Sequence, residues 1–256
     1  MRNARTIGSI FVAGAVAVTA ACSTDTMSVD GLEAEAGIQN RNGGASVART
    51  YEVTVYNLTG GQPFTPPLVA THQGAADLFD VGSPASVGVQ QIAENGNLGP
   101  MLSALGASDH VSDIVVAVAG EPPPVMAGGS VTFEIDAEPG ARFLSFISML
   151  ICTNDGFTGV DRLKLPSQVG RSVTRSLAAY DAGTEVNTED FSDLVPPCPA
   201  LTGIQNPPPG TGMSDPALAE NGVIHHHPGI AGTAGLQPGL HGWTNPVAMV
   251  AVTRIN

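Results

Sequence analysis

The chain has 256 residues, and its 23 acidic side chains outnumber 10 lysine and arginine side chains, giving a net charge of −13. This balance excludes nucleic acid, and anionic membrane surfaces bound through a basic patch, because both partners need concentrated positive charge. Only one lysine, Lys164, occurs in the chain. An acidic protein instead suits divalent cations, although solubility alone also accounts for such a bias.

The N-terminus is typical of an exported protein. A basic start precedes an uncharged, alanine- and valine-rich stretch, which predicts a signal peptide over residues 1–21 that is too short to span a membrane comfortably. The end of this stretch, Val18 to Cys22, resembles a bacterial lipoprotein cleavage box with Cys22 as the lipid-bearing residue, although Thr19 stands where such boxes usually carry leucine. Cleavage near Ala20 or Ala21 without lipidation is the alternative. Both readings take the protein out of the cytoplasm, to the bacterial cell envelope or beyond it.

Residues 22–48 have few apolar side chains and several glycine, serine and acidic residues. Such a segment cannot bury enough surface to offset the entropy lost on ordering, so we expect a flexible tether. Residues 49–256 then form the folded domain, which is long enough to build a substantial core.

The domain is expected to be mainly β, with antiparallel strands arranged as a sandwich. Tyr51, Val53 and Val55 alternate with polar residues, which is the period of a half-buried strand. Further β-branched runs predict strands at Asp113–Val118, Ser130–Asp136, Arg142–Ile151, Arg171–Leu177 and Val247–Ile255.

Short helices are expected to interrupt this pattern early in the chain, at Ala75–Phe79, Pro84–Ala93 and Leu98–Leu105. Pro207–Gly239 is rich in glycine and proline, which predicts a long irregular segment before the last strand. Loops of that length are often functional, and some are merely mobile.

The cysteines agree with export. With Cys22 assigned to the lipid, Cys152 and Cys198 remain as an even pair in an oxidising compartment. A disulfide between them would close a long loop around the acidic region and stabilise the fold by about 4 kcal/mol. Two buried free thiols are the alternative, and no nearby CxxC pattern suggests a metal site.

Acidic residues follow apolar runs at two places. The run from Phe143 to Ile151 ends in a polar turn that contains Asp155, and a second turn brings Asp181 and Glu185 four residues apart. Several carboxylate oxygens on irregular loops suit a hard cation such as calcium. Asp161 is a weaker candidate, because it can instead support the loop by accepting backbone N–H bonds. The non-functional alternative is that Asp155 and Asp181 stabilise local turns and Glu185 is solvated.

Three motifs together resemble the spondin N-terminal domain family. They are the YEVTVYNLT segment starting at Tyr51, the SMLICTNDGFTGVDRL segment starting at Ser148, and the YDAGTE segment starting at Tyr180. The resemblance covers roughly 49–256, and it implies a C2-like β-sandwich with a few inserted helices and a calcium ion held by acidic loops at one end.

Carried over residue by residue, the resemblance implies that Asp155, Asp181 and Glu185 are the calcium ligands. Glu185 stands where the animal members have Asp, which changes its reach, and Gly156 replaces a tryptophan of their motif. The family also implies a non-catalytic role in cell-surface adhesion or extracellular recognition, with a partner that the sequence does not identify.

Two other functions compete with this reading. His225, His226 and His227, with His241 further on, suggest an exported zinc-dependent hydrolase, although no HExxH helix is present and a packed or exposed histidine run is the simpler interpretation. The second competing function is that of a purely structural envelope lipoprotein.

Other catalytic groupings have little support. An Asp155–Asp181 pair would resemble a glycosidase, but the chain has one tryptophan and few other aromatic residues to stack on a sugar. His72 with Ser145 or Ser148 could form part of a catalytic triad, and nothing in their spacing favours it.

Overall fold

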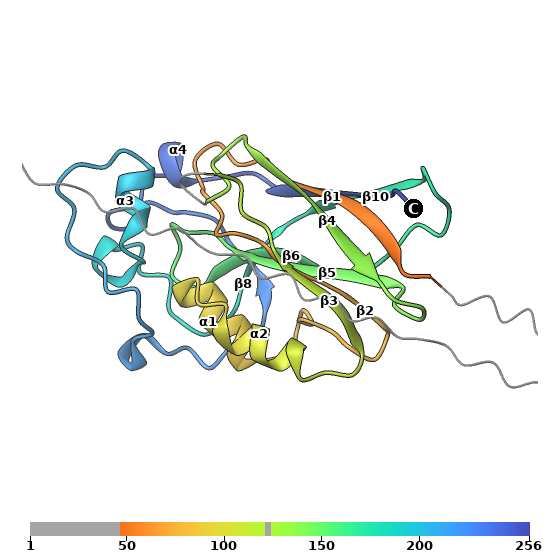
Figure 1. Ribbon diagram of the computed structural model, residues 1–256. Helices are drawn as coiled ribbons and strands as arrows, with labels where there is room; N and C mark the ends of the chain where they lie inside the picture. The colour runs from red at the N-terminus through yellow and green to blue at the C-terminus, as the bar shows by residue number, and fades with distance from the viewer. Residues whose placement is uncertain (1–46, 121–123) are drawn as a thin grey trace, which may run out of the picture. The chain divides into compact units, whose positions relative to one another are not determined.

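Two antiparallel sheets form the body of the molecule, and the computed structural model describes residues 47–120 and 124–256 of it (Figure 1). The predicted signal peptide, Cys22 and nearly all of the predicted tether lie outside these residues. The described residues belong to one compact unit. The prediction of a mainly β sandwich with a few short helices is confirmed.

The smaller sheet has four strands in the order β4-β1-β10-β7. Its strands are β1 (Arg49–Asn57), β4 (Ser130–Ala137), β7 (Ser172–Leu177) and β10 (Ala248–Arg254). The larger sheet has six strands in the order β3-β2-β5-β6-β8-β9. Its strands are β2 (Leu68–His72), β3 (Val111–Val116), β5 (Phe143–Met149), β6 (Gly156–Lys164), β8 (Ala179–Asp181) and β9 (His225–His226).

The first hydrophobic core lies between the two sheets. Tyr51, Val53 and Val55 of β1 are fully buried there, as their alternation with polar residues predicts. They pack with side chains of the larger sheet that include Phe146 of β5. One face of each sheet is therefore sealed from water by the other sheet.

A second core covers the outer face of the larger sheet. Helices α1 (Val87–Asn95) and α2 (Gly99–Gly106) lie across that face (Figure 1) and pack on residues such as Ile147 of β5. Ser86 caps the start of α1 by accepting a hydrogen bond from the backbone N–H of Val89. Strand β5 is thus buried on both faces, which explains why its sequence is almost continuously apolar.

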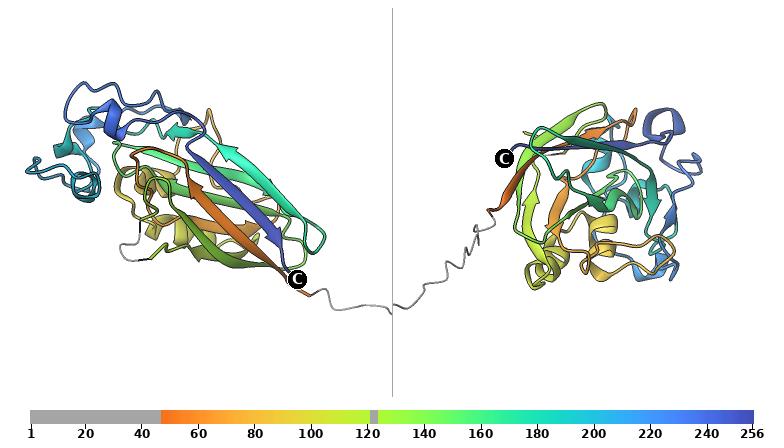
Figure 2. Two further views of the ribbon diagram at one scale, coloured as in Figure 1. Left: turned by 90° about the horizontal axis from the view of Figure 1, so that it is seen from above. Right: turned by 90° about the vertical axis from the view of Figure 1, so that its right-hand side faces the viewer.

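The remaining helices lie in the loops at one end of the sandwich, opposite the end that carries the C-terminus (Figures 1 and 2). They are η1 (Phe191–Asp193), α3 (Pro197–Leu201), η2 (Pro216–Leu218) and α4 (Pro238–His241). No helix in the described part of the chain is long and apolar enough to cross a membrane.

Some sequence predictions of local structure are wrong. Ala75–Phe79 forms an irregular loop, because Leu78 and Phe79 pack onto the sheet and the Leu78 N–H binds a side chain of β6 instead of a helical carbonyl. The helix expected at Pro84–Ala93 begins at Val87. The sequence also does not predict strands β2, β6, β8 and β9. Asp161 lies within β6, and Asp181 ends β8.

Candidate metal centre

Strand pairing brings Asp155 and Asp181 together. Asp155 ends the turn between β5 and β6, and the next residue, Gly156, pairs with Asp181 across the β6–β8 ladder. The backbone carbonyl of Asp155 also accepts a 3.1 Å hydrogen bond from the N–H of Ala182. Two acidic turns that are distant in sequence therefore lie side by side at one end of the larger sheet.

The Asp155 carboxylate is fully buried and only half satisfied. Its Oδ2 accepts hydrogen bonds from the Thr184 N–H at 2.8 Å, the Thr184 hydroxyl at 3.2 Å and the Glu185 N–H at 3.1 Å. Its Oδ1 has no hydrogen-bond partner among the described residues. A buried carboxylate oxygen without a partner is costly, so this atom is a strong candidate to bind a cation.

Asp181 is also buried, with both carboxylate oxygens in hydrogen bonds. Oδ1 accepts from the Gly183 N–H at 2.8 Å, and Oδ2 accepts from the Asn187 side-chain amide at 2.7 Å. Gly183 has a φ of +68°, and a Cβ there would come within 2.7 Å of the Val223 backbone. The glycine of the YDAGTE motif is therefore required both for the turn and for the close approach of the loop that precedes β9.

Burial and like charge make this pair electrostatically unfavourable. Removal from water, followed by the neighbouring charge of Asp181, raises the pKa of Asp155 to about 6 despite its three hydrogen bonds. Among the described residues no lysine or arginine forms an ion pair with either carboxylate, and the basic neighbour is the exposed His225, whose Nδ1 lies 3.8 Å from Asp181 Oδ1. A divalent cation would neutralise both charges and satisfy Asp155 Oδ1, so the residues present fit calcium.

Glu185 lies near these two residues but its carboxylate binds elsewhere. Its Oε1 accepts a 2.8 Å hydrogen bond from the Asp215 N–H, and burial raises its pKa to about 7. The side chain is 4% exposed, so it is not the solvated residue of the non-functional alternative. Oxygen atoms of Asp155, Asp181 and Glu185 do not all lie within 4.8 Å of one another. Glu185 fixes the segment around Asp215 beside the acidic pair.

Asp161 does not join the pair. It lies five residues after Gly156 in β6, which is about 16 Å along the strand. Its Oδ1 accepts from the Leu78 N–H at 2.8 Å and from the Ser145 hydroxyl at 3.0 Å, and its Oδ2 forms an ion pair with Arg162. Asp161 therefore supports the loop by accepting a backbone N–H bond, which is the alternative to binding the metal.

Two polar residues outside the predicted ligand set organise the surrounding loops. Asn154 Oδ1 accepts a 3.1 Å hydrogen bond from the Thr188 N–H. Glu189, which follows Thr188, has a φ of +58°. Its buried carboxylate accepts hydrogen bonds from the N–H groups of three consecutive loop residues, Ala231 to Thr233. No spacing in the sequence marks these residues, because their partners are backbone groups far along the chain.

The predicted disulfide between Cys152 and Cys198 is confirmed, with a Cα–Cα distance of 5.1 Å. Gln62 is fully buried beside it. Its Oε1 accepts from the Cys152 N–H at 3.0 Å, and its Nε2 donates to the carbonyls of Cys152 at 3.0 Å and His241 at 2.8 Å. The sulfur atoms lie close to the His241 ring, but their bond to each other occupies them, so they are not metal ligands.

The histidine residues do not converge on one point. His225 and His226 are exposed on β9, whereas His227 is buried against Trp243 with the ring centroids 5.0 Å apart. Burial lowers the pKa of His227 to about 4. His241 packs instead against Phe191, with its Nε2 3.1 Å from the Thr202 hydroxyl.

His72 and Ser145 do meet, although both are fully buried. His72 Nε2 lies 2.7 Å from Ser145 Oγ, and the same hydroxyl oxygen accepts a 2.8 Å hydrogen bond from the Arg162 N–H. A nucleophile enclosed in this way has no route to a substrate. The grouping holds together two irregular strands, since both β2 and β5 shift register at this level.

These features define a class of protein: a two-sheet antiparallel sandwich with a disulfide and a pair of buried aspartates at one end. The family model Spondin_N matches residues 56–199, which contain both aspartates and both disulfide cysteines, and the chain belongs to this family. A search of curated proteins gave no significant match.

Proposed function

We propose that this protein is an exported, non-catalytic calcium-binding module that uses the loop-rich end of the sandwich to recognise an extracellular or envelope ligand. The observation that carries the proposal is Asp155 Oδ1, a fully buried carboxylate oxygen without a partner among the described residues. Beside it, Asp181 supplies a second buried carboxylate. Asp155 and Asp181 are the proposed calcium ligands.

Calcium would act structurally at this place. The Asp155 carboxylate accepts backbone N–H bonds from the loop after β8, so a cation bound to it would tie that loop to the β5–β6 turn. Neutralising both aspartates would also remove the repulsion between them. The bound ion would hold these loops rigid for a partner, which favours adhesion or recognition over catalysis.

The proposal is tested by thermal unfolding of the full chain in EDTA and in millimolar calcium. Calcium at a hundred times its Kd is expected to stabilise the native state by about 3 kcal/mol, because it binds the folded form alone. For a domain of this size that corresponds to a rise in Tm of roughly 6–12 °C. Asp155→Asn and Asp181→Asn are expected to remove the rise, because both keep the side-chain shape and lose the charge.

Asp109→Asn is the matched control, since Asp109 is an exposed acid outside the pair. It is expected to keep the full calcium response. An unchanged response in Asp155→Asn would contradict the proposed site. A Tm that rises with zinc and not with calcium would instead support the histidine-based hydrolase, and a Tm that responds to neither ion would support a purely structural lipoprotein.

A further inference from the structure

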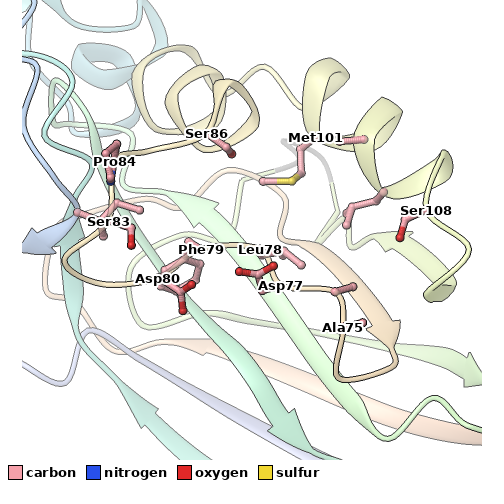
Figure 3. A pocket seen from close by; sticks show the side chains of 14 residues that line it. Ala75, Asp77, Leu78, Phe79, Asp80, Ser83, Pro84, Ser86, Met101 and Ser108 are labelled. Atoms are coloured by element: carbon pink, nitrogen blue, oxygen red, sulfur yellow. The ribbon is translucent and has the colours of Figure 1, made fainter.

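A cavity of about 420 Å³ lies on the outer side of the larger sheet, between the loop that follows β2 and helix α2 (Figure 3). This volume is in the range of small-ligand sites. Its apolar lining comes from buried side chains of the loop, α2 and the residue before β9. They are Leu78, Phe79, Met101, Leu105 and Ile224.

The walls of the cavity are held in place without a ligand. The Leu78 N–H binds Asp161, and Phe79 packs on the rings of Phe157 and Tyr180 at centroid distances of 5.1 and 5.5 Å. Further along the loop, the Ile224 N–H donates to the Ser83 carbonyl at 2.9 Å. Because the loop is anchored at both places, a ligand would lose little affinity to ordering it.

The rim of the cavity is acidic. Asp77 and Asp80 lie on the same side of it (Figure 3), and none of its lining residues is lysine, arginine or histidine. Arg162 forms ion pairs with Asp161 at 2.7 Å and Asp80 at 3.1 Å, so its guanidinium pairs with two of the three nearby carboxylates. Asp77 has no ion pair among the described residues. Partial burial, followed by the charges of Asp161 and Asp80, raises the pKa of Asp77.

We propose that this cavity binds an aliphatic ammonium group, with the carbon chain against the apolar lining and the positive charge beside Asp77 and Asp80. An anion would be repelled at the rim, and a bare metal ion would leave the apolar interior unused. A lysine side chain of a partner and a free alkylamine share this chemistry, since both join a charged head to a flexible apolar stem.

This site is separate from the proposed calcium centre. Tyr180 and Asp181 are consecutive in β8, so their side chains point to opposite faces of the sheet. Tyr180 is in contact with Phe79 of the cavity wall. The Asp181 side chain lies on the opposite face. A variant that removes ligand binding in the cavity should therefore leave calcium binding measurable, and the reverse also holds.

The test is a titration of the full chain, in saturating calcium, with pentylammonium chloride and with n-pentanol as the neutral control. The Met101 methyl resonance, assigned from a Met101→Leu variant, is expected to shift with a Kd on the order of 1 mM, the value expected for a ligand of so few atoms. Pentanol is expected to bind at least about fivefold more weakly, since it lacks the charge. Equal binding of the alcohol, or no shift at Met101, would overturn the proposal.

Three variants locate the binding. Asp77→Asn is expected to weaken pentylammonium about fivefold, and Ala104→Phe is expected to abolish binding by filling the cavity from an exposed position on α2. Glu134→Gln, an exposed acid on β4, is the control and is expected to bind normally. Normal binding by both Asp77→Asn and Ala104→Phe would place the ligand elsewhere.

A parallel titration with N-acetyl-lysine methylamide distinguishes the two sources of the ammonium group. Binding at least as tight as that of pentylammonium assigns the cavity to a lysine side chain, and weaker binding assigns it to a free amine. A retained calcium-dependent rise in Tm in Asp77→Asn and Ala104→Phe shows that both variants are folded and that the calcium site is unaffected.

Discussion

Asp155 is the residue at which the demands of folding and binding conflict. Its carboxylate is removed from water, lies beside Asp181, and leaves Oδ1 without a hydrogen-bond partner among the described residues. A residue selected for stability alone would be asparagine, whose amide could replace the charge without changing the shape. The charged side chain therefore supports the proposed cation site.

The calcium-free protein is expected to show this conflict as a pH dependence. The pKa of Asp155 is about 6 when folded, against an ordinary value of 3.8, so the native state holds the proton more tightly than the unfolded state. Burying the charged carboxylate lowers the free energy of unfolding. This destabilisation is absent below about pH 4 and reaches its full size above about pH 6. In EDTA, the stability of Asp155→Asn relative to wild type should therefore increase by about 3 kcal/mol as the pH rises from about 4 to above 6.

Urea unfolding of both proteins at pH 4 and pH 8 measures this difference. Comparing wild type with the variant cancels the other titrating groups, including His227, whose lowered pKa acts in the opposite direction. A stability difference that does not change with pH would mean that the Asp155 carboxylate is not buried in solution.

At the level of elements, the short strand β8 connects the two parts of the proposed centre. It aligns Asp181 with Gly156 of β6, and Gly183 then lets the chain turn against the loop before β9. The Gly183 carbonyl accepts a 2.7 Å hydrogen bond from the Gly222 N–H, which fixes the second side of the turn. The turn is therefore rigid at Thr184 and Glu185, whose N–H groups donate to the Asp155 carboxylate.

Gly183→Ala is expected to destabilise the protein by about 2–4 kcal/mol, because its φ is positive and a Cβ would collide with the Val223 backbone. Gly60→Ala is the matched control, since nothing lies within 4 Å of a Cβ there. It should change stability by less than about 0.5 kcal/mol. Urea unfolding checks both, and similar values for the two variants would contradict the described turn.

The sequence predicted these elements unevenly. Strands with alternating residues, such as β1, were found to within two residues, because one face meets the core and the other meets water. Strand β2 was missed because all five of its residues are buried and no alternation remains. The motif order placed Asp155 and Asp181 in one candidate site. The position of Glu185 depends on a backbone N–H thirty residues away, which no local pattern encodes.

At the scale of the whole molecule, the disulfide and Gln62 join the loops at one end to the body of the sandwich. The disulfide links the β5–β6 turn to α3, across a separation of 46 residues that includes the proposed centre. Gln62 binds the same turn and the carbonyl of His241, at the end of α4. These links hold the long irregular segments against the sheets without regular secondary structure.

Replacing Cys152 and Cys198 together by alanine is expected to cost about 4 kcal/mol of stability, because the unfolded chain regains the freedom of the closed loop. Urea unfolding with and without dithiothreitol checks the origin of the loss. The reductant should destabilise wild type by a similar amount and leave the double variant unchanged. A wild type insensitive to the reductant would show that the bridge contributes little.

Strand β1 runs from one end of the sandwich toward the other. Its first residues lie beside the C-terminus, where the Thr50 N–H donates to the Asn256 side chain. Its last residue, Asn57, donates to the Gln62 carbonyl next to the disulfide, about 24 Å further along the strand than Thr50. The start of β1 and the C-terminus thus lie at one pole of the sandwich, and the cross-linked loops lie at the other. A molecule attached at either terminus of the described domain would therefore leave those loops open to a partner.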